Sequence, residues 1–193
     1  MYSFALTKEE GVFHLLIEIP SVVRIDYDNY YHKSNLPLRV ITTDFGKVII
    51  ACDTNAIYQQ LILTNLQFFD RHSHIDYNYI DKVYSKRIDE LLSSNKQCVE
   101  KYEYSILIIA EGKSYQLYSD GYIKEDDRLI STMPVGTIYN GIFDLENKHG
   151  KDFLIKVFYL YEIANKDFAF PAVYINTKTF NPLIIRRKGI WQP

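Results

Sequence analysis

The sequence predicts an α+β fold of the αββα type, in which antiparallel sheets are sandwiched between helical layers. Two observations predict it. Short apolar runs are joined by polar turns that end in glycine, and pairs of helical patterns alternate with these hairpins before a final strand pair. A chain of 193 residues can bury a core without disulfides, so one domain is expected over residues 1–193.

The first quarter of the chain has the pattern of strands. Polar turns ending in Gly11 and Gly46 separate apolar runs, which is typical of hairpins. Residues 48–51 are apolar without alternation, which indicates a strand that is covered on both faces. Strands are expected at residues 2–7, 12–19, 22–27, 38–43 and 47–52.

Helical patterns begin after this region. Asp53 or Thr54 can act as the N-cap of a helix over residues 54–69, and residues 76–93 carry apolar side chains at three-and-four spacing. The remaining elements follow in order. Strands are expected at residues 104–110, 114–118, 122–123 and 128–132, helices at 135–147 and 151–165, and strands at 172–176 and 183–187.

Charge and cysteine content exclude several classes of protein. The 22 Lys and Arg against 24 Asp and Glu give a net charge of −2, so no general attraction to nucleic acid or to an anionic membrane is expected. No apolar run is long enough to span a membrane. Cys52 and Cys98 are not in a C-x-x-C pair, which favours a reducing compartment and a cytoplasmic protein. Since nucleotide-binding glycine motifs are absent, no cofactor is expected.

Three segments together resemble a known family. Residues 45–54, which contain G-K-V-I-I-A-C-D, look like the first strand pair of the proteasome β-type N-terminal-nucleophile (Ntn) hydrolases, where the segment reads G-x-V-V-x-A-x-D. Residues 106–121 look like a later hairpin of that family, and residues 133–145 look like the entry to its third helix. The resemblance implies an Ntn-like sandwich over residues 38–187, with residues 1–30 as an N-terminal β elaboration.

The departures from this family imply a protein without its activity. Family members use a processed Thr, Ser or Cys at the head of the first strand as nucleophile and base. Counting back from Asp53 places Pro37 there, and the strand pair that carries the catalytic lysine is not found because Thr54 enters a helix. We therefore expect a non-catalytic interaction or assembly protein. The alternative is an Ntn-type amide hydrolase activated by internal cleavage, with Thr42 or Thr43 as nucleophile and Asp53 as the orienting carboxylate.

One cluster has metal-like spacing. His72, His74 and Asp76 resemble the H-x-H-x-D-H signature of metallo-β-lactamase-fold hydrolases, because alternate histidines on an extended segment can reach one ion. The final histidine of that signature is Tyr77 here. A polar loop between two helices, with Asp76 as N-cap of the second, is the favoured interpretation, and no bound metal is expected.

Three further groups have a chemical and a structural interpretation. Cys52 is either a nucleophile beside Asp53 or, as we favour, a buried inert thiol. Residues 186–188, with Trp191, could bind phosphate and bases, which leaves nucleic-acid binding through a C-terminal basic patch as a further alternative, but a solvated terminus is favoured. Residues 125–127 are acidic but lack the ligand spacing of a calcium loop.

The helix expected at residues 151–165 is apolar almost all round. One side can pack on a sheet, and the other side still needs a cover. Phe158 and Tyr161 are therefore candidate interface residues, and the expected partner is a second copy of the chain or another protein.

Overall fold

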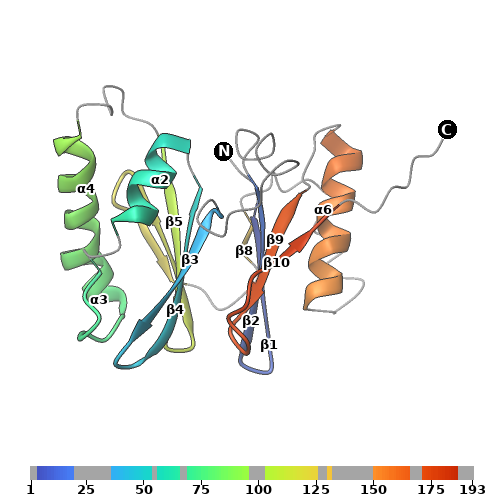
Figure 1. The fold of residues 1–193 in the computed structure, drawn as a ribbon, viewed down its shortest axis with the longest axis horizontal. Coiled ribbons are helices and arrows are strands. Elements are labelled where there is room, and N and C mark those ends of the chain that lie inside the picture. The colour runs from blue at the N-terminus through green and yellow to red at the C-terminus, as the bar shows by residue number, and fades with distance from the viewer. Residues whose placement is uncertain are drawn as a thin grey trace. The chain divides into compact units, whose positions relative to one another are not determined.

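The computed structural model describes residues 4–19, 36–53, 56–65, 69–95, 103–125, 130–131, 150–165 and 171–186 (Figure 1). These residues form an α+β fold with two antiparallel sheets of five strands each, as the sequence predicts. The chain divides into two compact units. Unit 1 is built on residues 33–127, and unit 2 on residues 2–32 and 128–193.

The sheet of unit 1 has the order β3-β4-β5-β6-β7. Its strands are β3 (Leu38–Thr43), β4 (Gly46–Asp53), β5 (Ser105–Ala110), β6 (Lys113–Tyr118) and β7 (Ile123–Glu125). Each strand is antiparallel to the next. Val48 to Cys52 are all at most 2% exposed, which confirms that the non-alternating run forms a strand covered on both faces.

The helices of unit 1 lie on one face of this sheet (Figure 1). They are α2 (Ala56–Thr64), α3 (Tyr77–Tyr79), the π-helical segment η3 (Ile80–Tyr84) and α4 (Ser85–Ser94). The last three run without a break over the helix predicted at residues 76–93. Ile80, Tyr84 and Ile88 share its buried face and pack against the sheet in one core.

The sheet of unit 2 has the order β10-β9-β2-β1-β8. Its strands are β1 (Phe4–Glu9), β2 (Val12–Glu18), β8 (Ile130–Ser131), β9 (Ala172–Asn176) and β10 (Leu183–Ile185). Glu10 and Gly11 link β1 to β2 with φ of 49° and 79°, as a two-residue hairpin requires. The described part of residues 1–30 therefore supplies two interior strands of this sheet.

One described helix covers the sheet of unit 2. It is α6 (Lys151–Asn165), which contacts β1 and β2. The core that it forms consists of Ala5, Leu16, Phe153, Leu154, Val157, Phe158, Ala172 and Tyr174. The strand expected at residues 22–27 and the helix expected at residues 135–147 lie outside the described residues. None of the helices in the described ranges is both long and apolar enough to cross a membrane.

Candidate functional site

Two hairpin turns and one loop meet in unit 1. The β3–β4 turn is formed by Asp44 and Phe45, and the β5–β6 turn by Glu111 and Gly112, whose φ values of 49° and 78° are those of a two-residue hairpin. The loop at residues 70–76 leads into α3. The backbone N–H of Asp44 donates to the carbonyl of Arg71 at 3.0 Å, so the loop is bound directly to the first turn.

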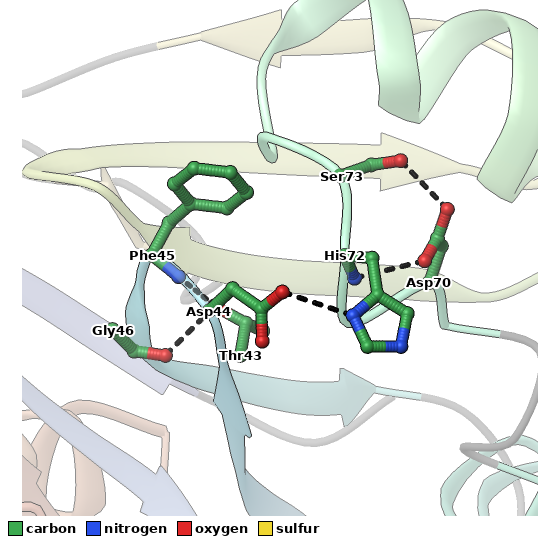
Figure 2. A network of polar contacts seen from close by, with 7 residues as sticks. All are labelled: Thr43, Asp44, Phe45, Gly46, Asp70, His72 and Ser73. Carbon is green, nitrogen blue, oxygen red and sulfur yellow. Dashed lines mark hydrogen bonds and ion pairs between the residues drawn. The ribbon is translucent and has the colours of Figure 1, made fainter.

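Side chains of the loop extend this contact (Figure 2). His72 Nδ1 lies 2.9 Å from Asp44 Oδ2, and this hydrogen bond raises the pKa of His72. Asp70 accepts the Ser73 hydroxyl at 2.6 Å and the His72 backbone N–H at 2.9 Å. These two bonds lower the pKa of Asp70. The carboxylates and the charged form of the imidazole therefore stabilise each other.

A second histidine binds the second turn. His74 Nδ1 lies 2.9 Å from Glu111 Oε2, and the other oxygen of Glu111 accepts the Ile75 backbone N–H at 2.8 Å. The ring of Phe45 packs on the ring of His74, with centroids 3.6 Å apart. The loop at residues 70–76 is thus joined to both hairpin turns. We call this group of Asp44, Phe45, His72, His74 and Glu111 the loop anchor.

The polar network around the loop has the residue types of a hydrolase triad but not its connections. In a triad, a histidine accepts the proton of a serine hydroxyl while a carboxylate binds its other nitrogen. Here the Ser73 hydroxyl donates to Asp70, while His72 binds Asp44 (Figure 2). The network therefore leaves no activated nucleophile and serves to hold the loop.

The candidate metal ligands are not brought together. His72 and His74 bind different carboxylates, and the described part of the chain contains no group of three or more His, Cys, Asp or Glu side chains placed to hold an ion. Asp76 instead accepts the Tyr79 backbone N–H at 2.8 Å and caps α3. This confirms the interpretation of Asp76 as an N-cap.

The candidate catalytic threonines lie inside a hairpin. Thr42 pairs with Lys47 and Thr43 with Gly46, and the Thr43 hydroxyl donates to the Gly46 carbonyl at 2.8 Å. Thr43 Oγ1 also accepts the Phe45 backbone N–H at 3.2 Å, so this hydroxyl belongs to the turn. Asp53 ends β4, where its backbone pairs with Ser105; its side chain lies outside the description.

The other candidates occupy ordinary structural positions. Cys52 is fully buried in β4, as expected of an inert thiol. Glu125 forms an ion pair with Lys113 at 2.6 Å, and Arg186 is exposed. The remaining residues of the acidic and C-terminal basic clusters, Asp126, Asp127, Arg187, Lys188 and Trp191, lie outside the described residues.

The two candidate interface residues differ in what the structure describes. Phe158 is 0% exposed and packs in the core of unit 2, so contacts within the chain account for its burial. The side chain of Tyr161 lies outside the description.

A second polar cluster lies in unit 2. His14 Nδ1 is 2.7 Å from the hydroxyl of Tyr174, which also accepts the Asn176 side-chain amide at 3.2 Å. These residues come from β2 and β9, which pair side by side. Burial raises the pKa of Tyr174, so its hydroxyl remains protonated. The cluster satisfies the hydroxyl of a buried tyrosine within the sheet.

The two carboxylates of the loop anchor did not emerge from the sequence as functional residues. Asp44 and Glu111 are 28 and 37 residues away from their histidine partners. The available signal was their position. Both occupy two-residue hairpin turns at the ends of β3 and β5, which are the strands that flank β4.

Solved structures share this fold. No family model and no curated protein matches the chain. A mutant of Anbu from Hyphomicrobium sp. strain MC1 superposes with a TM-score of 0.65 at 12% identity, over 97% of this chain and 88% of that chain. The helical assembly of the Anbu complex from Pseudomonas aeruginosa gives 0.59 at 10% identity, over 98% and 88%. Thiobacillus denitrificans BPH in complex with epoxomicin gives 0.59 at 8% identity, over 91% and 97%.

The chain therefore has the proteasome β-type, Ntn-like fold that its sequence resembles. Because the superposition with Anbu covers 97–98% of this chain, it includes most of residues 1–37 as well as the part from which the resemblance was recognised.

Proposed function

We propose that this chain is a non-catalytic interaction or assembly protein of the cytoplasm, built on the proteasome-like fold. The observation that carries the proposal is Arg39. It is the basic residue of β3, the first strand of the second hairpin, and its guanidinium donates to the carbonyls of Leu36 and Leu38. The absence of a paired-cysteine motif supports the compartment.

Chain order gives Arg39 its significance. The hairpin β1–β2 precedes β3–β4, so β3–β4, which contains the segment that resembles the family's first strand pair in sequence, is the second strand pair of the chain. The family resemblance expects a catalytic lysine on the second pair. Arg39 cannot replace a lysine in proton transfer, because a guanidinium stays protonated at any physiological pH. Lys47, the lysine of β4, is exposed beside the turn.

Internal cleavage at the candidate threonines would disrupt the sheet. A new N-terminus at Thr42 or Thr43 would separate the rest of β3 from the turn that sets its register with β4. The hydroxyl of Thr43 would also have to leave the Gly46 carbonyl. Both costs weigh against the hydrolase alternative in that form.

With β1 as the first strand, the hydrolase alternative takes another form. The residue before β1 is Ser3, a hydroxyl residue whose placement is not described. A single mass measurement therefore tests three possible new N-termini, at Ser3, Thr42 and Thr43. Intact mass of purified protein is expected to match residues 1–193, with or without Met1. A stable species that begins at Ser3, Thr42 or Thr43 would favour the enzyme.

Epoxomicin supplies an independent test, because it is present in the structure of the bacterial neighbour BPH. Incubation with epoxomicin is expected to leave the mass of this chain unchanged. A stoichiometric adduct that disappears in Ser3→Ala would overturn the non-catalytic proposal and identify the nucleophile.

Self-association is the second part of the proposal. It is supported by the Anbu neighbour from Pseudomonas aeruginosa, which forms a helical assembly. The contact proposed here is at Tyr161 of α6, the other candidate interface residue, since Phe158 is already covered within unit 2. Light scattering at micromolar concentration is expected to give a mass of at least about two chains. A clean monomer would contradict self-association and leave a different protein as partner.

Tyr161→Asp tests the location of this contact. The substitution is expected to lower the mass towards one chain while the circular dichroism spectrum stays native. Lys156→Asp places the same carboxylate at an exposed position of the same helix, with a change of two charges instead of one, and is the control. An unchanged mass in Tyr161→Asp would show that the contact between copies does not depend on Tyr161.

A further inference from the structure

β3 is one of the two edge strands of the sheet in unit 1, as far as the structure describes the chain. Among the described residues it pairs with β4 and with no other strand. The backbone groups on its outer side therefore form a row of donors and acceptors, which is a template for an additional strand.

One hydrogen bond identifies the residues of this row. The backbone N–H of Cys52 donates to the Pro37 carbonyl at 3.0 Å, so residue 37 faces β4. In an antiparallel pair, alternate residues exchange bonds with the partner. The backbone N–H and C=O groups of Arg39, Ile41 and Thr43 hence point towards β4. The N–H and C=O groups of Leu38, Val40 and Thr42 point away from the sheet.

Both ends of the outer row are occupied by the chain itself. Arg39 Nη1 donates to the carbonyls of Leu36 at 3.0 Å and Leu38 at 2.9 Å. At the other end, the Asp44 N–H donates to the Arg71 carbonyl. In the part of the chain that the structure describes, the outer groups of Val40 and Thr42 between these ends receive no such bond.

The composition of β3 makes an open edge hazardous. Its residues, LRVITT, are mostly β-branched, and Arg39 is the one charge among them. Segments of high β propensity and low charge pair readily with copies of themselves, and natural edge strands often carry features that prevent this.

We propose that Arg39 protects the β3 edge against strand addition by a second copy of this chain. Its guanidinium occupies the Leu36 and Leu38 carbonyls, which an incoming strand needs for its own N–H groups. The inference goes beyond the proposed assembly function, because it identifies a surface through which copies do not associate. The oligomeric state of the wild-type protein, whatever it is, serves as the baseline.

Arg39→Met is the direct test, because methionine keeps an unbranched stem and removes the donors. The mass from light scattering is expected to rise at least about twofold above the wild-type value at the same concentration. Amide exchange of Val40 and Thr42 is expected to slow by about tenfold or more as these groups become paired. Lys47→Met removes the same charge from the same hairpin and is expected to leave both measurements unchanged.

A proline identifies the site of association. The N–H of Thr42 points outward, so Thr42→Pro removes no bond to β4 but blocks an added strand. The double variant R39M/T42P is expected to return to the wild-type mass. A rise that persists in the double variant, or an unchanged mass in R39M, would overturn the proposal.

Arg39→Lys keeps the inference testable should the methionine variant fail to fold. Lysine retains the charge but lacks the planar fork that bridges two carbonyls. R39K is expected to associate more than the wild type, and adding Thr42→Pro to R39K is expected to restore the wild-type mass. A folded R39K with wild-type mass and wild-type exchange at Val40 would equally overturn the proposal.

Discussion

Glu111 binds two successive residues, His74 and Ile75, of the loop at residues 70–76 at the same time. One carboxylate oxygen lies 2.9 Å from His74 Nδ1, and the other accepts the Ile75 backbone N–H at 2.8 Å. Ile75 is buried in the core of unit 1, so this carboxylate determines where the loop enters the core. The turn between β5 and β6 thereby positions a segment that precedes α3.

Glu111→Ala is therefore expected to destabilise unit 1. The Ile75 N–H would lose its acceptor and His74 its partner, at a cost of about 1–2 kcal/mol in the free energy of unfolding. Alanine keeps a Cβ at this φ of 49°, so backbone strain is unchanged. Urea denaturation measures the effect. Glu125→Ala removes the partly exposed pair with Lys113 and is expected to lower the free energy of unfolding clearly less, because solvent screens an exposed ion pair. Equal costs in the two variants would contradict the anchoring role.

Local patterns predicted the elements of both sheets well, because a hairpin with a two-residue turn is determined by neighbours in sequence. The Gly11 and Gly46 turns are found where they were expected. The helix over residues 76–93 is also found, but with a π-helical segment directly after α3. This segment has five residues, which is too short for the spacing of its apolar side chains to distinguish a π-helical turn from an α-helical one.

Contacts between distant segments were not predictable in the same way. β2 pairs with β9 through His14 and Asn176, which are far apart in the chain, and sequence patterns do not specify such partners. The same reason explains the loop anchor. The spacing of His72 and His74 suggested metal chemistry, whereas their actual partners come from two hairpin turns.

The contact between His72 and Asp44 predicts a pH dependence. Because the pKa of His72 is raised in the folded state, the stabilisation is complete below its ordinary value and is lost as pH rises through the folded value. Asp70 strengthens the shift, and Arg71 opposes it. Nuclear magnetic resonance titration of the His72 ring measures the pKa, which is expected to fall in Asp44→Asn. An identical titration curve in that variant would contradict the assignment.

A side chain at position 150 is expected to destabilise the fold. Its φ is 91°, and a Cβ would lie 3.2 Å from Glu9 Oε2. Gly150→Ala should therefore cost about 1–2 kcal/mol, from the unfavourable φ and the close approach together. Gly112→Ala is the matched control, since its φ is 78° with nothing within 4 Å. In thermal unfolding, G150A is expected to have a lower midpoint temperature than G112A. Adding Glu9→Ala to both variants is expected to reduce the difference between their midpoint temperatures. An unchanged difference would exclude the contact with Glu9 as its cause.

Phe158→Ala distinguishes a core residue from an interface residue. Phe158 is 0% exposed among Leu154, Val157 and Ala5, so its truncation leaves a cavity that is expected to cost about 3–5 kcal/mol. Because this cavity lies within one chain, the loss should be the same at every protein concentration. A residue buried only by a second copy would instead lose stability that depends on concentration, since association and folding are then linked. Denaturation of F158A and wild-type protein at two concentrations a hundredfold apart makes this measurement. If the difference in the free energy of unfolding between F158A and the wild type depended on concentration, Phe158 would be an interface residue.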